Sequence, residues 1–263
     1  MAQAAARAAG AFTLFSGCRS LKRTHAVAWR TAIMERWRAM TMTMPQAPTT
    51  EREAAYYANK FRQRRLQRLL TIIDEIVAAR GTCRILDVGG WPAYWQHLEP
   101  LWRDRPIHIA MINLVNVPVP DARYSSFTGD ARDLGQFSDR SFDLVHSNSV
   151  IEHVGLWRDQ CKMAQEIRRL APRYFVQTPN YWFPLEPHLR TPFIHWLPEP
   201  WRVGIVKHRA CGYHPRAQSY VEARHILDDP RLLDAPAMAV LFPEAIIERE
   251  RFAGLTKSLI AIR

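Results

Sequence analysis

Residues 84–95, RILDVGGWPAYW, constrain the fold more than any other stretch of the chain. An apolar run leads into Gly89 and Gly90, and Pro92 then stands at the first helical position, where proline is tolerated. A strand, a glycine turn and a helix in this order often bind nucleotide-type ligands. Because the turn lacks the later glycine of a dinucleotide fingerprint, it indicates such a ligand without identifying it. Trp91 precedes proline and is predicted to be extended, either covering the ligand or packing on the helix.

Apolar runs alternate with helical patterns along the chain. Strands are predicted at 83–88, 107–114, 124–130, 142–148 and 173–179. Helices are predicted at 50–80 and 158–170, because apolar residues there recur three and four positions apart, and at 92–104, because Pro92 stands at the first helical position. This alternation favours a doubly wound parallel sheet that binds ligands at the carboxyl ends of its strands. Two further helices, at 219–227 and 235–242, are followed by two terminal strands, at 245–252 and 255–263.

Residues 180–215 interrupt the alternation. Prolines recur every few residues and exclude a long helix, while the many aromatic residues make a flexible linker improbable. We interpret this segment as an aromatic and proline-rich insertion after the fifth strand, forming a lid on the substrate side. His208, Cys211 and His214 supply three potential metal ligands without a fourth, so turn formation and packing explain them better than zinc, and we expect no metal site.

The formal charge of +11 is distributed unevenly. Residues 1–50 contain seven Arg or Lys and one acid, which leaves +5 for the rest of the chain. This ordinary excess argues against a nucleic-acid partner. Four arginines of the first predicted helix are most simply interpreted as a solvated face: Arg62, Arg64, Arg65 and Arg68.

The first 48 residues are rich in Ala, Arg and Met and nearly free of acids. We interpret residues 1–48 as a disordered or mis-assigned N-terminal extension, with a transit peptide as the alternative, and residues 49–263 as the folded domain. Four widely separated cysteines fit a reducing compartment, and no apolar run is long enough to span a bilayer. Cytoplasmic localisation is therefore expected.

Polar residues follow each predicted strand, and together they carry a resemblance. The stretches RILDVGG, INL, FTGDARDL, FDLVHSNSVIEHV and YFVQTPN resemble the successive motifs of the class I S-adenosylmethionine-dependent methyltransferases, in particular the branch that includes the quinone-biosynthesis type. The resemblance covers roughly residues 55–263. It implies a Rossmann-like seven-stranded sheet of order 3-2-1-4-5-7-6 whose last strand is antiparallel.

The resemblance also implies roles for particular residues. S-adenosyl-L-methionine is the implied cofactor, with Asp87 near its methionine amino end and Gly89 and Gly90 allowing close approach of the backbone. Asn113 stands where the family usually has an acid that holds the ribose hydroxyls, and an amide accepts from one hydroxyl and donates to the other. The remaining implied cofactor contacts are Asp130 and the backbone of Ala131 at the adenine and Asn148 beside the methionine portion.

Methyl transfer depends on alignment of the acceptor, and a base matters when that acceptor is a hydroxyl. His153 is the candidate base, because histidine titrates near neutrality, and a structural histidine is the alternative. His188, His195 and Trp182 are candidates for the acceptor pocket.

The predicted function is therefore a methyltransferase acting on a small-molecule or lipid-like acceptor. The rings of the insertion favour an apolar acceptor or peripheral contact with a membrane, unless they only pack the lid. A nicotinamide-dependent Rossmann oxidoreductase or epimerase, and a non-catalytic cofactor-binding pseudoenzyme, are the alternatives. The sequence assigns no oligomeric state.

Overall fold

The computed structural model describes residues 60–263, which belong to one compact unit, Arg52–Arg263. The predicted extension 1–48 and the predicted helix start at Thr50 lie outside the described residues. No helix within 60–263 is both long enough and apolar enough to cross a bilayer.

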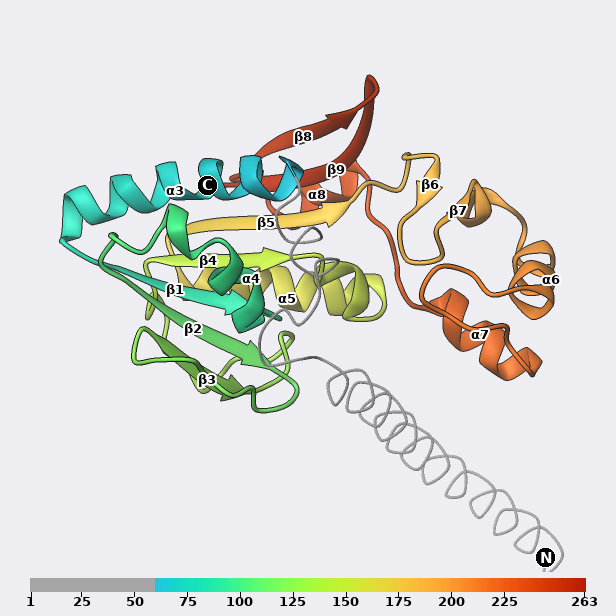
Figure 1. The fold of residues 1–263 in the computed structure, drawn as a ribbon, viewed down its shortest axis with the longest axis horizontal. Coiled ribbons are helices and arrows are strands. Elements are labelled where there is room, and N and C mark those ends of the chain that lie inside the picture. The colour runs from blue at the N-terminus through green and yellow to red at the C-terminus, as the bar shows by residue number, and fades with distance from the viewer. Residues whose placement is uncertain (1–59) are drawn as a thin grey trace, which may run out of the picture. The chain divides into compact units, whose positions relative to one another are not determined.

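A seven-stranded sheet of order β3-β2-β1-β4-β5-β9-β8 forms the centre of this unit (Figure 1). Its strands are β1 (Cys83–Val88), β2 (Ile107–Asn113), β3 (Tyr124–Thr128), β4 (Leu144–Asn148), β5 (Arg173–Pro179), β8 (Ile246–Phe252) and β9 (Leu255–Ile262). The first five are parallel, and β9 runs antiparallel to both β5 and β8. The predicted order and the antiparallel last strand are confirmed.

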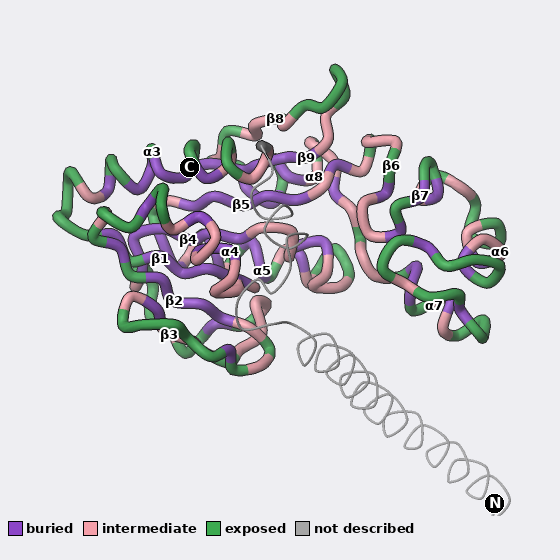
Figure 2. Tube along the Cα trace, viewed as in Figure 1, coloured by how far each residue is buried: buried purple, intermediate pink, exposed green. Residues whose placement is uncertain are grey.

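Helices cover both faces of the sheet, as a doubly wound fold requires. On one face, α3 (Lys60–Arg80) and α4 (Pro92–His97) pack their apolar side chains against alternate residues of the strands, such as Ile85 and Ile109. On the other face, α5 (Trp157–Leu170) and α8 (Ala235–Leu241) pack against the intervening residues, such as Leu86 and Val88. Figure 2 shows the central strands β1, β2, β4 and β5 as almost continuously buried, whereas the edge strand β8 is largely exposed or part-buried.

The helix after Pro92 is shorter than predicted. It ends at His97, and a separate 3-10 turn, η1 (Glu99–Leu101), follows it. Proline at position 100 explains the break, because it has no N–H to donate and its ring clashes with the carbonyl of the preceding turn.

The segment after β5 forms a packed layer of its own. It contains β6 (Leu185–Glu186), β7 (Thr191–Pro192), η3 (Ile194–Trp196), α6 (Glu199–His208) and α7 (Tyr220–Asp228). A separate apolar cluster joins η3, α6 and α7, and it includes Val203 and Val206 of α6 with Ala223 and Ile226 of α7. The packed segment therefore extends beyond residue 215 to include α7. In Figure 1 the arrowheads of β4 and β5 point toward the side on which β6, β7, α6 and α7 lie.

Candidate functional site

The glycine turn after β1 is built on a buried carboxylate. Asp87 is 2% exposed and accepts hydrogen bonds from Trp95 Nε1 at 2.7 Å and from His146 Nδ1 at 2.6 Å, one on each carboxylate oxygen. The structure thus places Asp87 beneath the turn, where it ties the turn to α4 and β4. Trp91 is extended, with φ −124° and ψ 141°, as its position before Pro92 predicts.

Both glycines of the turn are required by neighbouring protein atoms. Gly89 has φ +73°, and an added Cβ would lie 2.5 Å from Val150 Cγ2. At Gly90 an added Cβ would overlap the Asp87 carboxylate. Asn113, at the end of β2, donates from Nδ2 to the Gly90 carbonyl at 2.8 Å, so that its amide holds the turn from the neighbouring strand.

Asn148, at the end of β4, accepts a hydrogen bond from Arg65, which was expected to be solvated. Arg65 of α3 donates to Asn148 Oδ1 at 2.6 Å and to Gln177 Oε1 at 2.8 Å, and its Nε lies 3.2 Å from Glu250 Oε1. The Arg65 side chain is only 11% exposed. The interpretation of Arg65 as part of a solvated face is therefore wrong, although Arg64 and Arg68 are exposed. Helical spacing did not reveal this contact, because its partners lie 83 and 112 residues further along the chain.

The predicted adenine-side residues lie beyond β3. Asp130 accepts from the Arg132 backbone N–H at 3.0 Å and from its Nε at 2.8 Å. Ala131 packs partly buried against the core. The carboxyl ends of β1, β2 and β4 bring the glycine turn, Asn113 and Asn148 to one edge of the sheet, since these strands are neighbours.

His153 lies at the same edge, in the 3-10 turn η2 (Ile151–His153) that follows β4. Its Nδ1 is 2.8 Å from Asp229 Oδ1, and its ring stands perpendicular to that of His188 with centroids 4.8 Å apart. Glu152, between Ile151 and His153, is fully buried and accepts from Thr178 Oγ1 at 2.9 Å.

Opposing influences act on the pKa of His153. Burial is the largest and lowers the pKa, while the hydrogen bond to Asp229 and the charge of Glu152 raise it. The charges of Asp229 and Glu186 act in the same direction as Glu152. Their sum outweighs burial, so the pKa of His153 lies above its usual value. Its role as a base stays a prediction.

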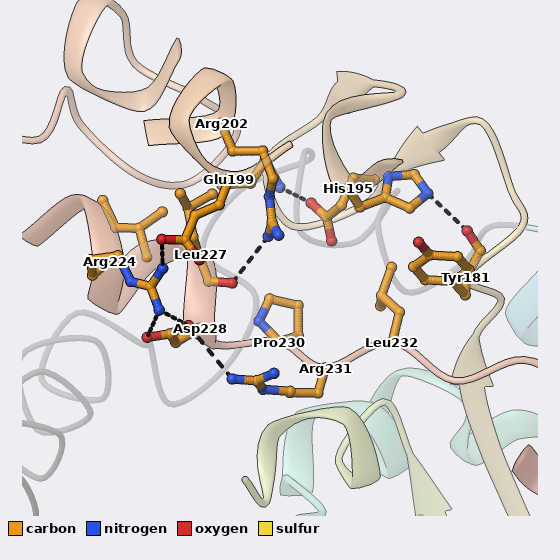
Figure 3. Close-up of a pocket in the computed structure, with 13 residues that line it drawn as sticks. Tyr181, His195, Glu199, Arg202, Arg224, Leu227, Asp228, Pro230, Arg231 and Leu232 are labelled. Atoms are coloured by element: carbon orange, nitrogen blue, oxygen red, sulfur yellow. Dashed lines mark hydrogen bonds and ion pairs between the residues drawn. The ribbon is translucent and has the colours of Figure 1, made fainter. Parts of the chain in front are cut away.

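A pocket lies within the segment that follows β5 (Figure 3). His195 contributes to its lining and has its Nε2 2.8 Å from the Tyr181 carbonyl oxygen, and burial lowers the pKa of this histidine. Three arginines and three carboxylates also line the pocket: Arg202, Arg224, Arg231, Glu186, Glu199 and Asp228. Arg224 pairs with both Glu199 and Asp228, and Asp228 lies 3.5 Å from Arg231. The pocket is therefore largely ionic.

The other two predicted pocket residues lie elsewhere. Trp182 is 60% exposed and packs at the surface against Trp196. His188 has its Nδ1 2.7 Å from Glu186 Oε1 and faces His153. Glu186 and Asp229, which hold the two histidines, were not predicted. No local pattern marks them, because their roles depend on how distant segments pack.

A family model described as a methyltransferase domain matches residues 106–173, which contain β2, β3, β4 and α5. The matched residues include the carboxyl ends of β2 and β4, where Asn113 and Asn148 lie. Residues 106–173 are therefore similar to a methyltransferase domain, and they lie in a sheet whose order is the one that the resemblance implied. S-adenosylmethionine is the cofactor that this similarity implies. The quinone-biosynthesis branch stays a prediction.

Solved structures with a similar fold include methyltransferases. The N-terminal domain of EvdMO1, crystallised in the presence of S-adenosylhomocysteine and D-fucose, is 14% identical, with 81% of this chain and 83% of that chain covered at a TM-score of 0.43. The 1,6-didemethyltoxoflavin-N1-methyltransferase of Burkholderia thailandensis is 12% identical, with 73% and 75% covered at a TM-score of 0.44. No curated protein matches the chain. At these TM-scores the likenesses add nothing to the argument from the sheet order.

Proposed function

We propose that this methyltransferase transfers the methyl group of S-adenosylmethionine to a small-molecule acceptor held between the carboxyl edge of the sheet and residues 181–232. The observation that carries the proposal is the meeting of the glycine turn, Asn113 and Asn148 at one edge, which the segment after β5 adjoins.

The residues at this edge fit the cofactor. The turn brings bare backbone to the sheet edge, because its two glycines carry no side chain. Asn113 keeps its amide oxygen as an acceptor for a ribose hydroxyl while its Nδ2 holds Gly90. Asp130 is proposed at the adenine, with the Ala131 backbone, and Asn148 at the methionine portion.

The chain contributes mainly position and desolvation to this reaction. A sulfonium is already a reactive electrophile, so an acceptor atom aligned with the methyl carbon supplies much of the rate enhancement. His153 lies in η2, the turn that follows β4, and is part-buried, so it lies near the edge where methyl transfer is proposed. There it is suited to receive a proton from an acceptor hydroxyl.

A lipid-like part of the acceptor is supported by exposed aromatic rings on the same segment. Trp182 and Phe193 each pack against Trp196, and the three rings are 60%, 51% and 37% exposed. Trp rings of this kind favour the boundary between water and lipid. Full-length protein should therefore sediment with phosphatidylcholine vesicles more strongly than a Trp182→Ser, Trp196→Ser double variant. Equal sedimentation would restrict the acceptor to soluble molecules.

Calorimetry and product analysis test the function itself. S-adenosylhomocysteine should bind the full-length protein in the micromolar range, and NAD should not bind. Incubation with methyl-labelled S-adenosylmethionine and a cell extract should then yield a labelled small molecule. Binding of NAD alone would replace the proposal with an oxidoreductase, and cofactor binding without labelled product would indicate a pseudoenzyme.

A further inference from the structure

Three potential metal ligands meet where the segment after β5 packs on the sheet edge. They are Glu152 and His153 from η2 and His188 from the loop between β6 and β7, and their ligand atoms all lie within 4.8 Å of one another. Glu152 is fully buried and both histidines are part-buried. The three residues are called the Glu–His–His cluster below.

One carboxylate oxygen of the cluster has no hydrogen-bond partner among the described residues. Oε2 of Glu152 accepts the Thr178 hydroxyl, but Oε1 is buried and has no hydrogen-bond partner among residues 60–263. A buried ionised oxygen without a partner costs roughly 1–3 kcal/mol or more. A cation bound at this oxygen would remove the cost.

Each histidine of the cluster is oriented as metal-binding histidines usually are. The Nδ1 atom of His153 contacts Asp229, and the Nδ1 atom of His188 contacts Glu186. A carboxylate acceptor fixes the neutral ring with its proton on Nδ1, so that the lone pair is on Nε2 and available to a metal. The two carboxylates also add negative charge around the cluster.

The position of His188 is itself held by the backbone. Glu186 is 3% exposed and also accepts the backbone N–H of Leu189, while Gly212 packs so closely on the His188 carbonyl that no side chain fits there. His188 is therefore presented to His153 by a built loop. Ligands of one ion at about 2.1 Å lie about 3.4 Å apart in a tetrahedron, whereas the ligand atoms of the cluster lie within 4.8 Å of one another, so binding requires them to approach by at most about 1.4 Å.

We propose that Glu152, His153 and His188 bind one divalent transition-metal ion, such as zinc or manganese. Two imidazoles and one carboxylate form the ligand set of catalytic zinc sites and of open facial sites, in which further positions remain for water or substrate. The proposal departs from the expectation of no metal, because these residues come from two segments that only the fold brings together.

A role for the ion rests on the proposed function. With the ion bound, His153 would be a ligand and would no longer be free to act as the base. The ion would instead bind the acceptor hydroxyl and lower its pKa, and the hydroxyl proton would pass to solvent. The acceptor oxygen then forms its bond to the methyl carbon while the carbon–sulfur bond breaks and its electron pair goes to sulfur, leaving neutral S-adenosylhomocysteine.

Calorimetry on full-length protein stripped with a chelator tests the site. Zn²⁺ and Mn²⁺ are titrated separately into wild type and into Glu152→Gln, His188→Gln and His108→Gln variants. The last is a matched control, since His108 is exposed on β2. We expect one ion per chain in the wild type and the control, and affinity at least 100-fold weaker in the two cluster variants.

Two outcomes overturn the proposal: no binding of either ion to the wild type, or equal affinity in wild type and both cluster variants. Circular dichroism shows whether a variant is folded, and Glu152→Gln keeps the shape of the side chain should His188→Gln fail to fold. S-adenosylhomocysteine binding is measured in parallel. Metal binding without it would refute the proposed function and leave the metal site standing, and the reverse would refute the metal site alone.

Discussion

Replacing Glu152 by Gln should stabilise the metal-free protein, although it alters a fully buried residue. The isosteric amide can keep the hydrogen bond from Thr178 on its carbonyl oxygen. Its NH₂ group then takes the place of Oε1, which has no partner among the described residues, and can donate to a ring nitrogen of the cluster. Relieving a buried unpaired oxygen is worth about 1–3 kcal/mol.

For a domain of this size, 1 kcal/mol shifts the melting temperature by about 2–4 °C. We therefore expect the Glu152→Gln variant to melt about 2–12 °C above wild type in excess chelator. Thermal unfolding followed by circular dichroism, with urea denaturation as a second measure, provides the values. In Zn²⁺ at 100 times its dissociation constant the wild type gains about 2.7 kcal/mol of stability and the variant does not. The difference between their melting temperatures should therefore shrink or change sign.

Glu250→Gln is the matched control, because it neutralises a carboxylate that has partners. Glu250 lies 3.2 Å from Arg65 Nε and accepts the Ser258 hydroxyl at 2.8 Å, with its side chain 10% exposed. Its neutralisation should cost about 1–3 kcal/mol. If both substitutions destabilise the chelated protein alike, the Glu152 carboxylate is already satisfied and the reasoning is wrong.

Three other substitutions test the turn and the histidine loop. Gly90→Ala should cost about 1–3 kcal/mol in urea denaturation, because the added Cβ displaces the Asp87 carboxylate; an unchanged midpoint would contradict the packing. Gly212→Ala should weaken Zn²⁺ binding at least tenfold in calorimetry by moving His188, while S-adenosylhomocysteine still binds; loss of both would indicate general misfolding. Asn113→Ala should lower S-adenosylhomocysteine affinity about tenfold, since the turn loses its anchor at the Gly90 carbonyl; unchanged affinity would separate this residue from the cofactor.

The sequence predicted the sheet well because its signals are local. Buried parallel strands appear as short apolar runs, and β1 and β5 begin and end where those runs do. The terminal hairpin of β8 and β9 was predicted from two short segments joined at Ala253 and Gly254, although β8 contains four charged residues. The error in α4 was also local, because Pro92 predicted where the helix begins while the effect of Pro100 on where it ends was overlooked.

Only those residues of the candidate site that lie at strand ends could be predicted from the sequence. Asn113 and Asn148 could be expected at one edge, because parallel strands end together. Arg65 could not be placed there, since its helix precedes the sheet in sequence and only the crossing of α3 over the strand ends brings it to Asn148. Glu186 and Asp229 act by holding His188 and His153, and no sequence pattern indicated either pair.

The two glycines after β1 acquire a physical reason that differs from the one a nucleotide turn suggests. A dinucleotide turn needs glycines where the backbone approaches a pyrophosphate, and the later glycine packs the helix on the strand. Here Gly90 leaves room for Asp87, whose carboxylate accepts the Trp95 indole N–H, so a hydrogen bond joins helix and strand. Close approach of α4 to β1 is then no longer required, and the large rings of Tyr94 and Trp95 pack in the core on this face of the sheet. The absence of a third glycine and the presence of the aromatic residues after the turn are thus two consequences of the same buried carboxylate.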